Sequence, residues 1–167
     1  MKSRVSSSEI TDPPETVGIG WYFEDYVVGR RYQTLGRTIT EGDIVNFVCL
    51  TGMMEELFAN VDYIEKESVI KGRVSPGALV YTFAEGLVLP STLQRTGIAF
   101  LGMDFKISSP AFAGDTIYVV CEVTAARPTS KPGRGIVTTK NEVRNQRGEL
   151  LLTYTPTRML KMRSAAK

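Results

Sequence analysis

The chain has 167 residues, of which 43% are hydrophobic and 23% charged, so it fits one globular domain rather than a disordered or fibrous chain. Its 20 Lys and Arg residues nearly balance 18 Asp and Glu residues, and the net charge of +2 gives no strong field for nucleic acid. No histidine is present, which excludes Ser-His-Asp and Cys-His nucleophiles, His-ligated zinc and an imidazole base from within this chain.

Residues 1–20 are rich in Ser, Thr, Pro and Glu and contain no apolar run typical of a secretory signal. We therefore expect a flexible N-terminal arm over residues 1–20, followed by a single domain over residues 21–167. The most apolar stretch of the chain is too short to span a bilayer and contains Glu85. These features predict a cytoplasmic protein that binds neither membranes nor nucleic acid.

The first predicted helix begins at the sequence TEGD, residues 40–43, where a capping hydroxyl precedes acidic first-turn residues. Apolar residues follow, so we predict a helix over residues 41–50. The sequence TG at residues 51–52 ends it, because glycine readily adopts the backbone conformation of a helix C-terminus. Patterning predicts three neighbouring segments: a strand over residues 31–38, a loop over residues 53–60 and a short helix over residues 61–68.

A second long helix is predicted after Ser75 and Pro76. The serine is expected to be its N-cap and the proline to occupy the first turn, where a missing N–H costs nothing. Over residues 78–89, apolar side chains cover nearly the whole circumference and leave a thin polar stripe at Thr82 and Glu85. We therefore expect this helix to be buried on almost every side.

The rest of the chain has the pattern of an antiparallel sheet. Apolar residues alternate with polar or mixed ones over residues 101–107 and 117–125, as in strands with one buried face. Two more strands are expected over residues 135–145 and 149–162, and Pro156 indicates a bulge or an edge in the last. A curved antiparallel sheet wrapped around one hydrophobic helix would bury both, so the expected fold is an α+β hot-dog fold.

Four features in this order resemble the MaoC-like acyl dehydratase and (R)-specific enoyl-CoA hydratase family over residues 23–162. They are the helix and TG at residues 40–52, GRVSPGAL at 72–79, SPAFAGDT at 109–116 and VRNQRGE at 143–149. The resemblance implies a hot-dog fold and reversible addition of water across the 2,3-bond of an acyl thioester of CoA or of an acyl carrier protein. It implies no cofactor other than the coenzyme A or phosphopantetheine that the substrate carries.

The residues that would carry this reaction depart from the family pattern. Family hydratases place an Asp after the Ser/Thr-Gly that ends the first helix and a His five positions later, and this pair activates the water. The corresponding residues here are Met53 and Phe58, whose side chains cannot accept a proton. Glu55 and Glu56 are the only carboxylates in this loop. Either could serve as a substitute acid and base, or both could be solvated surface residues or subunit contacts.

The resemblance also implies that backbone amides near the start of the central helix hold the thioester oxygen, at the positive end of the helix dipole. Ser75, Gly77 and Ala78 match this region. Backbone groups survive side-chain replacement, so a thioester site could persist without the Asp and His. The alternative is that these residues only begin a buried helix.

Three cations in a predicted hairpin loop, Arg127, Lys131 and Arg134, are candidates for the phosphates of CoA or phosphopantetheine, although a solvated turn fits them equally well. Cys49 and Cys121 lie among apolar residues, far apart and without metal-ligand spacing. They are expected to be two buried, reduced thiols, and no metal site is predicted.

Three functions remain open from the sequence. The first is an acyl-thioester hydro-lyase with an altered active site. The second is a non-catalytic subunit or acyl-CoA-binding module that completes a heteromer with a related, Asp- and His-bearing chain. The third is a hot-dog thioesterase that uses Glu85 or Glu55. Because an open sheet edge needs covering, we expect a homodimer or a heterodimer with a related chain.

Overall fold

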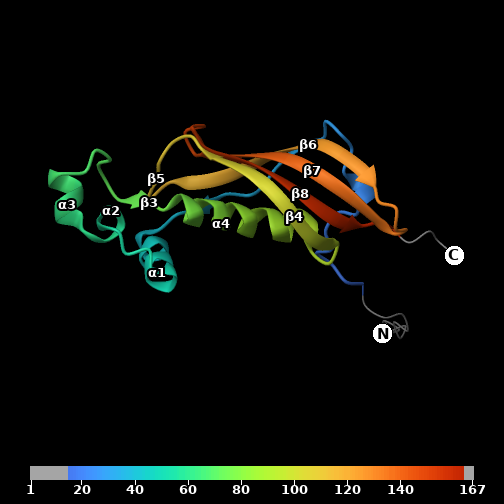
Figure 1. Cartoon of the computed structure of the whole chain (residues 1–167), viewed down its shortest axis with the longest axis horizontal. Coiled ribbons are helices and arrows are strands. Elements are labelled where there is room, and N and C mark those ends of the chain that lie inside the picture. The colour runs from blue at the N-terminus through green and yellow to red at the C-terminus, as the bar shows by residue number, and fades with distance from the viewer. Residues whose placement is uncertain (1–14, 164–167) are drawn as a thin grey trace, which may run out of the picture.

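The computed structural model of the chain describes residues 15–163, in which a curved antiparallel sheet arches over one long helix (Figure 1). The helices are α1 (Glu41–Thr51), α2 (Glu56–Ala59), α3 (Val61–Lys66) and α4 (Gly77–Val88). The strands are β1 (Arg31–Gln33), β2 (Arg37–Thr38), β3 (Val74–Ser75), β4 (Gly97–Ile107), β5 (Ala111–Phe112), β6 (Thr116–Pro128), β7 (Arg134–Asn145) and β8 (Leu150–Lys161). Short helical turns also occur over Phe23–Asp25 and Leu89–Leu93.

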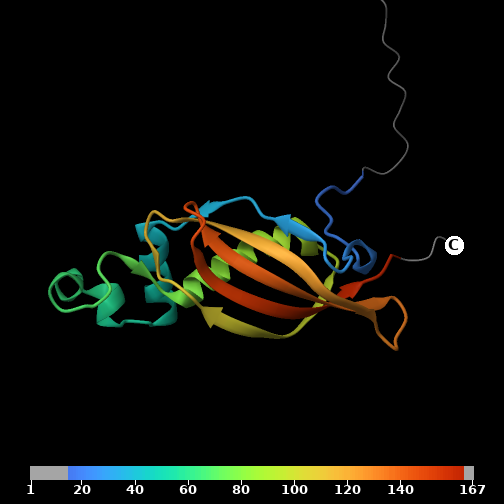
Figure 2. The same cartoon turned by 90° about the horizontal axis from the view of Figure 1, so that it is seen from above.

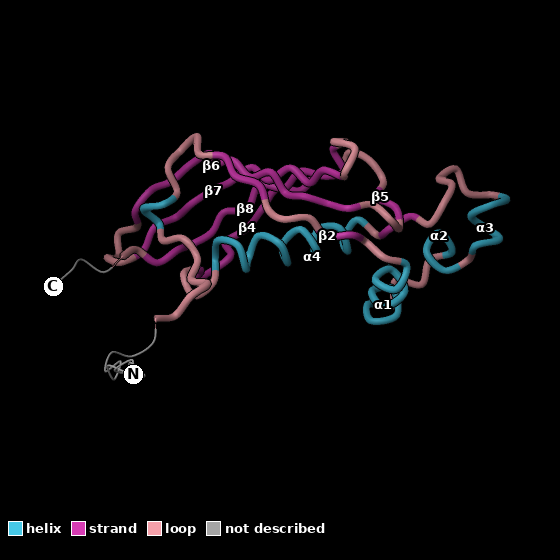
Figure 3. The backbone as a smooth tube through the Cα atoms, turned by 180° about the vertical axis from the view of Figure 1, so that it is seen from behind, coloured by secondary structure: helices cyan, strands magenta, loops and turns pink. Residues whose placement is uncertain are grey.

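The main sheet has the strand order β1-β6-β7-β8-β4, with β2 also paired to β6, and all recorded pairs are antiparallel. Helix α4 runs along one face of this sheet, while α1, α2 and α3 gather at one end of the molecule (Figure 3). The β6–β7 hairpin projects at the opposite end (Figure 2). This arrangement confirms the α+β hot-dog fold that the sequence predicts.

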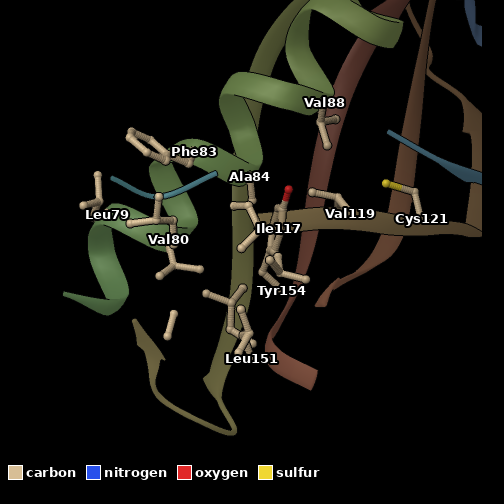
Figure 4. Packing of buried hydrophobic residues seen from close by; sticks show 14 of the residues in the cluster. Leu79, Val80, Phe83, Ala84, Val88, Ile117, Val119, Cys121, Leu151 and Tyr154 are labelled. Carbon is tan, nitrogen blue, oxygen red and sulfur yellow. The ribbon is translucent and has the colours of Figure 1, made fainter. Parts of the chain in front are cut away.

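The core lies between α4 and the sheet. Five residues on one face of α4 are buried: Leu79, Val80, Phe83, Ala84 and Val88. Val80, Ala84 and Val88 point toward inward-facing strand residues, among them Ile117, Val119, Leu151 and Tyr154 (Figure 4). Leu79 and Phe83 project to another side of the helix, where Arg37 stacks on the Phe83 ring. Buried and less buried positions alternate along β6, β7 and β8, as expected for strands with one face on the core.

The opposite face of α4 is open, so the prediction of burial on almost every side is wrong for the single chain. Ala78, Thr82, Gly86 and Leu89 are all exposed on this face. A single sheet covers only one side of a helix. The apolar residues of the sequence do not tell how many elements pack around that helix.

The predicted buried face of the strand at residues 101–107 is also wrong. Among the described residues, strand β4 pairs only with β8 and forms an edge of the sheet. Large apolar side chains along it are exposed: Ile98, Phe100, Leu101, Met103, Phe105 and Ile107. An exposed apolar edge of this kind is typical of a surface that associates with another chain.

The local signals for the first helices are confirmed. Thr40 and Asp43 form a capping box at the start of α1, and the Thr40 hydroxyl holds the pKa of Asp43 below its ordinary value. Gly52, with a φ of 72°, ends this helix. The predicted loop at residues 53–60 contains the one-turn helix α2, and the short helix predicted at 61–68 is α3.

Other predicted elements differ in detail. The strand expected over residues 31–38 is split into β1 and β2, which both pair with β6. Pro156 lies in β8, an inner strand between β7 and β4, so its placement at an edge is wrong. The register shifts on the β4 side fall near Gly102 instead. Of the predicted arm, residues 1–14 lie outside the described residues, and Gly20 is buried with its N–H donated to the Gln94 carbonyl.

Both cysteines are free, but only one is buried. Burial raises the pKa of Cys121 to about 12, which keeps this thiol protonated and unreactive. Cys49 is exposed on α1, so its predicted burial is wrong. Its apolar sequence neighbours lie on a helix that packs on the domain through one face only.

Candidate functional site

A cavity of about 290 Å³ lies at the N-terminal end of α4, and we call it the N-terminal cavity. Three regions meet there: the α2 region, the start of α4, and the end of β4 with the segment leading to β5. Its lining residues are Leu57, Phe58, Ile70, Val74, Ser75, Gly77, Val80, Ile107, Ser108, Ser109, Pro110, Ala111, Leu151 and Leu152. The lining is mainly apolar and contains no carboxylate.

The start of α4 is not capped by a side chain, so the prediction of Ser75 as N-cap is wrong. The N-cap is Pro76, and the helix begins at Gly77. Ser75 belongs to β3 and pairs with Ala111, and this extended pairing turns its hydroxyl toward the Pro76 carbonyl at 3.4 Å. Ser75 lies one position before the N-cap, and its hydroxyl is not hydrogen-bonded to an N–H of the first turn.

Two backbone donors are left free as a result. The first α4 residues with a hydrogen-bonded N–H are Leu79 and Val80, which both donate to the Pro76 carbonyl at 2.9 and 3.2 Å. Within the described residues, the N–H groups of Gly77 and Ala78 have no recorded acceptor. They lie at the positive end of the α4 dipole, which suits a carbonyl oxygen that gains negative charge. Gly77 lines the cavity, whereas Ala78 is exposed beside it.

Gly77 also packs closely against a neighbouring side chain. A Cβ added at this position would overlap Cδ1 of Ile107 and lie 3.4 Å from its Cγ1. Ile107 is at the end of β4 and lines the same cavity. Sequence reasoning missed Ile107, Ser108 and the β8 leucines as lining residues, because only tertiary contacts bring them to the start of α4.

The positions of the family Asp and His lie beside this cavity. The Phe58 ring lines the cavity, and its carbonyl accepts a hydrogen bond from Arg73, whose Nε also donates to Glu41 at 2.6 Å. Met53 is 38% exposed and does not line the cavity. The residue at the position where the resemblance places the family His is therefore an apolar part of the cavity wall.

Glu55 and Glu56 begin α2, with Glu55 as its N-cap. Both residues are exposed, and neither lines the N-terminal cavity. The apolar surroundings that would turn one of them into a substitute acid and base are therefore not found around their side chains. Their assignment as catalytic residues stays a prediction.

The three predicted phosphate-binding cations line a different hollow. Arg127, Lys131 and Arg134 surround a space of about 360 Å³ at the β6–β7 hairpin. This hairpin lies at the end of the molecule opposite α1, α2 and α3 (Figure 2). Within one chain, these cations and the N-terminal cavity are not brought together.

A second groove, of about 530 Å³, lies along the C-terminal half of α4, and we call it the Arg158 groove. Its lining residues are Tyr81, Thr82, Glu85, Leu89, Leu93, Gly97, Ile98, Ala99, Phe100 and Arg158. Arg158 donates through Nη2 to both oxygens of Glu85, at 2.6 and 2.5 Å, and the two side chains are only 10% and 14% exposed. Glu85, the predicted thioesterase carboxylate, is therefore held in a buried ion pair.

The described residues contain neither a cluster of metal-ligating side chains nor a membrane-spanning helix. Within residues 15–163, no cluster of three or more Cys, Asp or Glu side chains is placed to hold a metal ion. In the same part of the chain, no helix has the length and apolarity needed to cross a membrane.

Comparisons with known proteins add to this geometry. The family described as FAS1-like, dehydratase domain region, matches residues 26–154. Protein MaoC of Klebsiella aerogenes is 38% identical over 115 residues, which are 68% of this chain and 33% of that protein. Beta-methylmalyl-CoA dehydratase of Chloroflexus aurantiacus is 26% identical over 137 residues, which are 81% of this chain and 38% of that protein. The chain thus spans little more than a third of the length of these curated relatives.

Solved structures show the same fold. A monoamine oxidase regulatory protein from Archaeoglobus fulgius superimposes with a TM-score of 0.77 at 33% identity, covering 87% of this chain and 97% of that one. A Mycobacterium tuberculosis protein with a double hot-dog fold superimposes with a TM-score of 0.80 at 24% identity, covering 92% of this chain and 47% of that one. The second match shows the fold alone.

Proposed function

Because this chain belongs to the MaoC-like dehydratase and hydratase family, we propose that it binds acyl thioesters in the N-terminal cavity and takes part in the reversible addition of water to 2-enoyl thioesters. The observation that carries the proposal is the uncapped start of α4. The free N–H groups of Gly77 and Ala78 supply two donors for the thioester oxygen, and the apolar cavity beside them accepts the acyl chain. One relative is named a beta-methylmalyl-CoA dehydratase, and this name supports a CoA thioester as the class of substrate.

The chemistry at this site follows from the residues present. Water addition across the 2,3-bond places negative charge on the thioester oxygen, and N–H donors at a helix start stabilise that charge. The reaction also needs a group that takes a proton from water. The described lining offers serine hydroxyls but no carboxylate, so we expect this group to come from Glu55 or Glu56, or from another chain.

The absence of a carboxylate from the described cavity lining favours a second candidate function. In that role the chain is a non-catalytic, thioester-binding subunit of a heteromer, and a related chain contributes the Asp and His. The thioesterase alternative is less well supported, because both oxygens of Glu85 are engaged by Arg158.

Hydration of trans-2-enoyl-CoA is the assay that separates these candidates, followed as loss of the enoyl-thioester absorbance. If the chain is an enzyme by itself, the purified protein hydrates trans-2-enoyl-CoA. The kcat of the Glu55→Gln/Glu56→Gln double variant is then expected to be at least 100-fold lower. If it is a binding subunit, it binds acyl-CoA saturably without turnover and becomes active only with a family member that has the Asp and His. Release of free thiol would instead indicate thioester hydrolysis. Absence of both binding and turnover contradicts the proposed function.

We also propose that β4 pairs with β4 of a second hot-dog chain. Within the described residues no strand pairs with its outer edge, and its large apolar side chains are exposed. In an antiparallel pair, the Ile107 end of one strand lies beside the Gly97 end of the other. Gly97 is in register with Leu160, and Leu160 with Gly135 of the hairpin base. Pairing therefore brings the second chain's basic hairpin to the end where this N-terminal cavity lies.

A lysine in the centre of β4 tests this pairing. Met103→Lys places a charge in the proposed interface and is expected to convert a dimer into a monomer in sedimentation-velocity experiments. Leu50→Lys is the matched control, because Leu50 is 86% exposed on α1, away from β4. A wild-type chain that sediments as a monomer at micromolar concentration, and does not associate with a related chain, would contradict edge pairing.

A further inference from the structure

Three aromatic rings meet between α4 and the sheet. Tyr81 of α4 packs edge-to-face against Phe105 of β4, with ring centroids 5.7 Å apart, and against Tyr154 of β8, with centroids 5.2 Å apart. The interplanar angles are 87° and 88°. Tyr154 is fully buried under α4 (Figure 4), while Phe105 is 41% exposed on the sheet edge. Such contacts hold the Tyr81 ring in one orientation.

On each of the three elements, the aromatic residue lies in sequence between residues that line the two cavities, and Tyr81 itself lines the Arg158 groove. On α4, Val80 lines the N-terminal cavity, whereas Thr82 and Glu85 line the Arg158 groove. On β4, Ile107 lines the N-terminal cavity and Phe100 lines the Arg158 groove. The order on β8 is the same: Leu152 lines the N-terminal cavity, Tyr154 follows, and Arg158 lines the groove. The aromatic residues therefore stand at the boundary between the two spaces.

The chemistry changes across this boundary. The N-terminal cavity has an apolar lining suited to an alkyl chain, whereas the Arg158 groove contains the Glu85–Arg158 ion pair. An alkyl chain laid over that pair would remove the remaining water from two charges, which is unfavourable. A wall at the boundary prevents this loss.

Resting on the proposed function, we propose that Tyr81 is the specificity-determining residue that ends the acyl site and limits the length of the bound acyl chain. The thioester oxygen lies at Gly77 and Ala78, and the chain extends along α4 until it meets the Tyr81 ring. Short acyl groups fit, and longer ones are excluded by the ring and its two aromatic supports.

The test is the dissociation constant for saturated acyl-CoAs from butyryl to dodecanoyl, measured by titration calorimetry. Wild-type protein is expected to bind short chains and to lose at least tenfold in affinity beyond a limiting length. Tyr81→Ala should remove that loss and bind the longer chains as well as the short ones. Phe105→Ala removes a ring that supports Tyr81 from the exposed sheet edge, and it should also allow longer acyl chains to bind. This variant provides the test if Tyr81→Ala folds poorly.

Two matched variants make the result specific. Tyr81→Phe keeps the ring and should retain the wild-type limit, and Thr82→Ala changes the adjacent exposed residue and should also retain it. The same length profile in wild type, Tyr81→Ala and Phe105→Ala would overturn the proposal while leaving thioester binding intact.

Failure of the proposed function has a different signature. If no variant binds any acyl-CoA, the thioester site itself is wrong, and decanoate then tests the wall without the CoA moiety. Binding of decanoate by Tyr81→Ala but not by wild type would support the wall. Equal binding by both, or by neither, would overturn it.

Discussion

Replacing Glu85 with glutamine is expected to lower the free energy of unfolding by about 3 kcal/mol, because it leaves the Arg158 charge uncompensated in a buried site. Nη2 of Arg158 donates to both carboxylate oxygens, and the two side chains are 14% and 10% exposed. Urea denaturation at one fixed protein concentration measures the change, since association of subunits would otherwise alter apparent stability.

A double variant distinguishes the cost of a broken pair from the value of the pair itself. Glu85→Leu/Arg158→Met removes both charges. Its free energy of unfolding is expected to be within about 1 kcal/mol of the wild-type value, because an apolar pair can replace a buried ion pair. Asp62→Asn is the control for an exposed pair: its carboxylate lies 2.6 Å from Lys66, but both side chains are about 70% exposed. It should cost less than about 0.5 kcal/mol. An equal loss in Glu85→Gln and Asp62→Asn would show that burial does not govern these pairs.

Tyr154 connects this ion pair to the core. Burial raises the pKa of its hydroxyl, and the nearby Glu85 carboxylate raises the pKa further. The hydroxyl has no hydrogen-bond partner within the described residues, and the same is true of the Asn141 amide on the neighbouring strand. These groups share one region of the interior with Glu85 and Arg158, so loss of one charge is expected to disturb several polar groups.

Elements defined by local chemistry could be predicted from the sequence. The capping box of Thr40 and Asp43 and the left-handed Gly52 depend on neighbours within a few residues, and they gave the bounds of α1 closely. Strands β6, β7 and β8 were recognised because one face of each lies on the core, which imposes alternation on the sequence. The helix-plus-sheet combination then led to the fold.

Features that depend on tertiary contacts could not be predicted. Strand β4 alternates in sequence like its neighbours, yet it is an edge strand, and its apolar residues are exposed in the single chain. The open face of α4 is exposed in the same way. In both cases the sequence pattern indicates burial but does not tell whether the burying surface is internal or belongs to another molecule.

The candidate site shows a similar division. The sequence was sufficient to locate the start of α4 and the substitutions at Met53 and Phe58. It places the cap one residue too early, at Ser75 instead of Pro76, because the β3–β5 pairing that precedes the helix joins segments 36 residues apart at Ser75 and Ala111. That misassignment matters for function, since a capped helix would have fewer free N–H donors for a thioester oxygen.

Gly77→Ala is expected to weaken acyl-CoA binding by at least fivefold while leaving the fold intact. The added methyl group overlaps Cδ1 of Ile107, and relieving this overlap moves a side chain that lines the N-terminal cavity. Overpacking of this kind costs roughly 1–3 kcal/mol, which corresponds to about 5- to 150-fold in affinity when it falls on the bound state. Alanine is the better helix former by about 1 kcal/mol, so the variant should not unfold more readily through α4 itself.

The double variant Gly77→Ala/Ile107→Ala decides whether space is the cause. Removing the isoleucine side chain gives the new methyl group room, so affinity for butyryl-CoA should return to within about threefold of wild type, as measured by titration calorimetry. Ile107→Ala alone controls for the lost apolar contact. If the double variant binds as weakly as Gly77→Ala, the second substitution does not rescue binding. This result would indicate that Gly77→Ala changed the backbone geometry at the start of α4 rather than the cavity volume. Unaltered binding in Gly77→Ala would place the thioester elsewhere, because a ligand held by this N–H cannot be insensitive to a methyl group on the same residue.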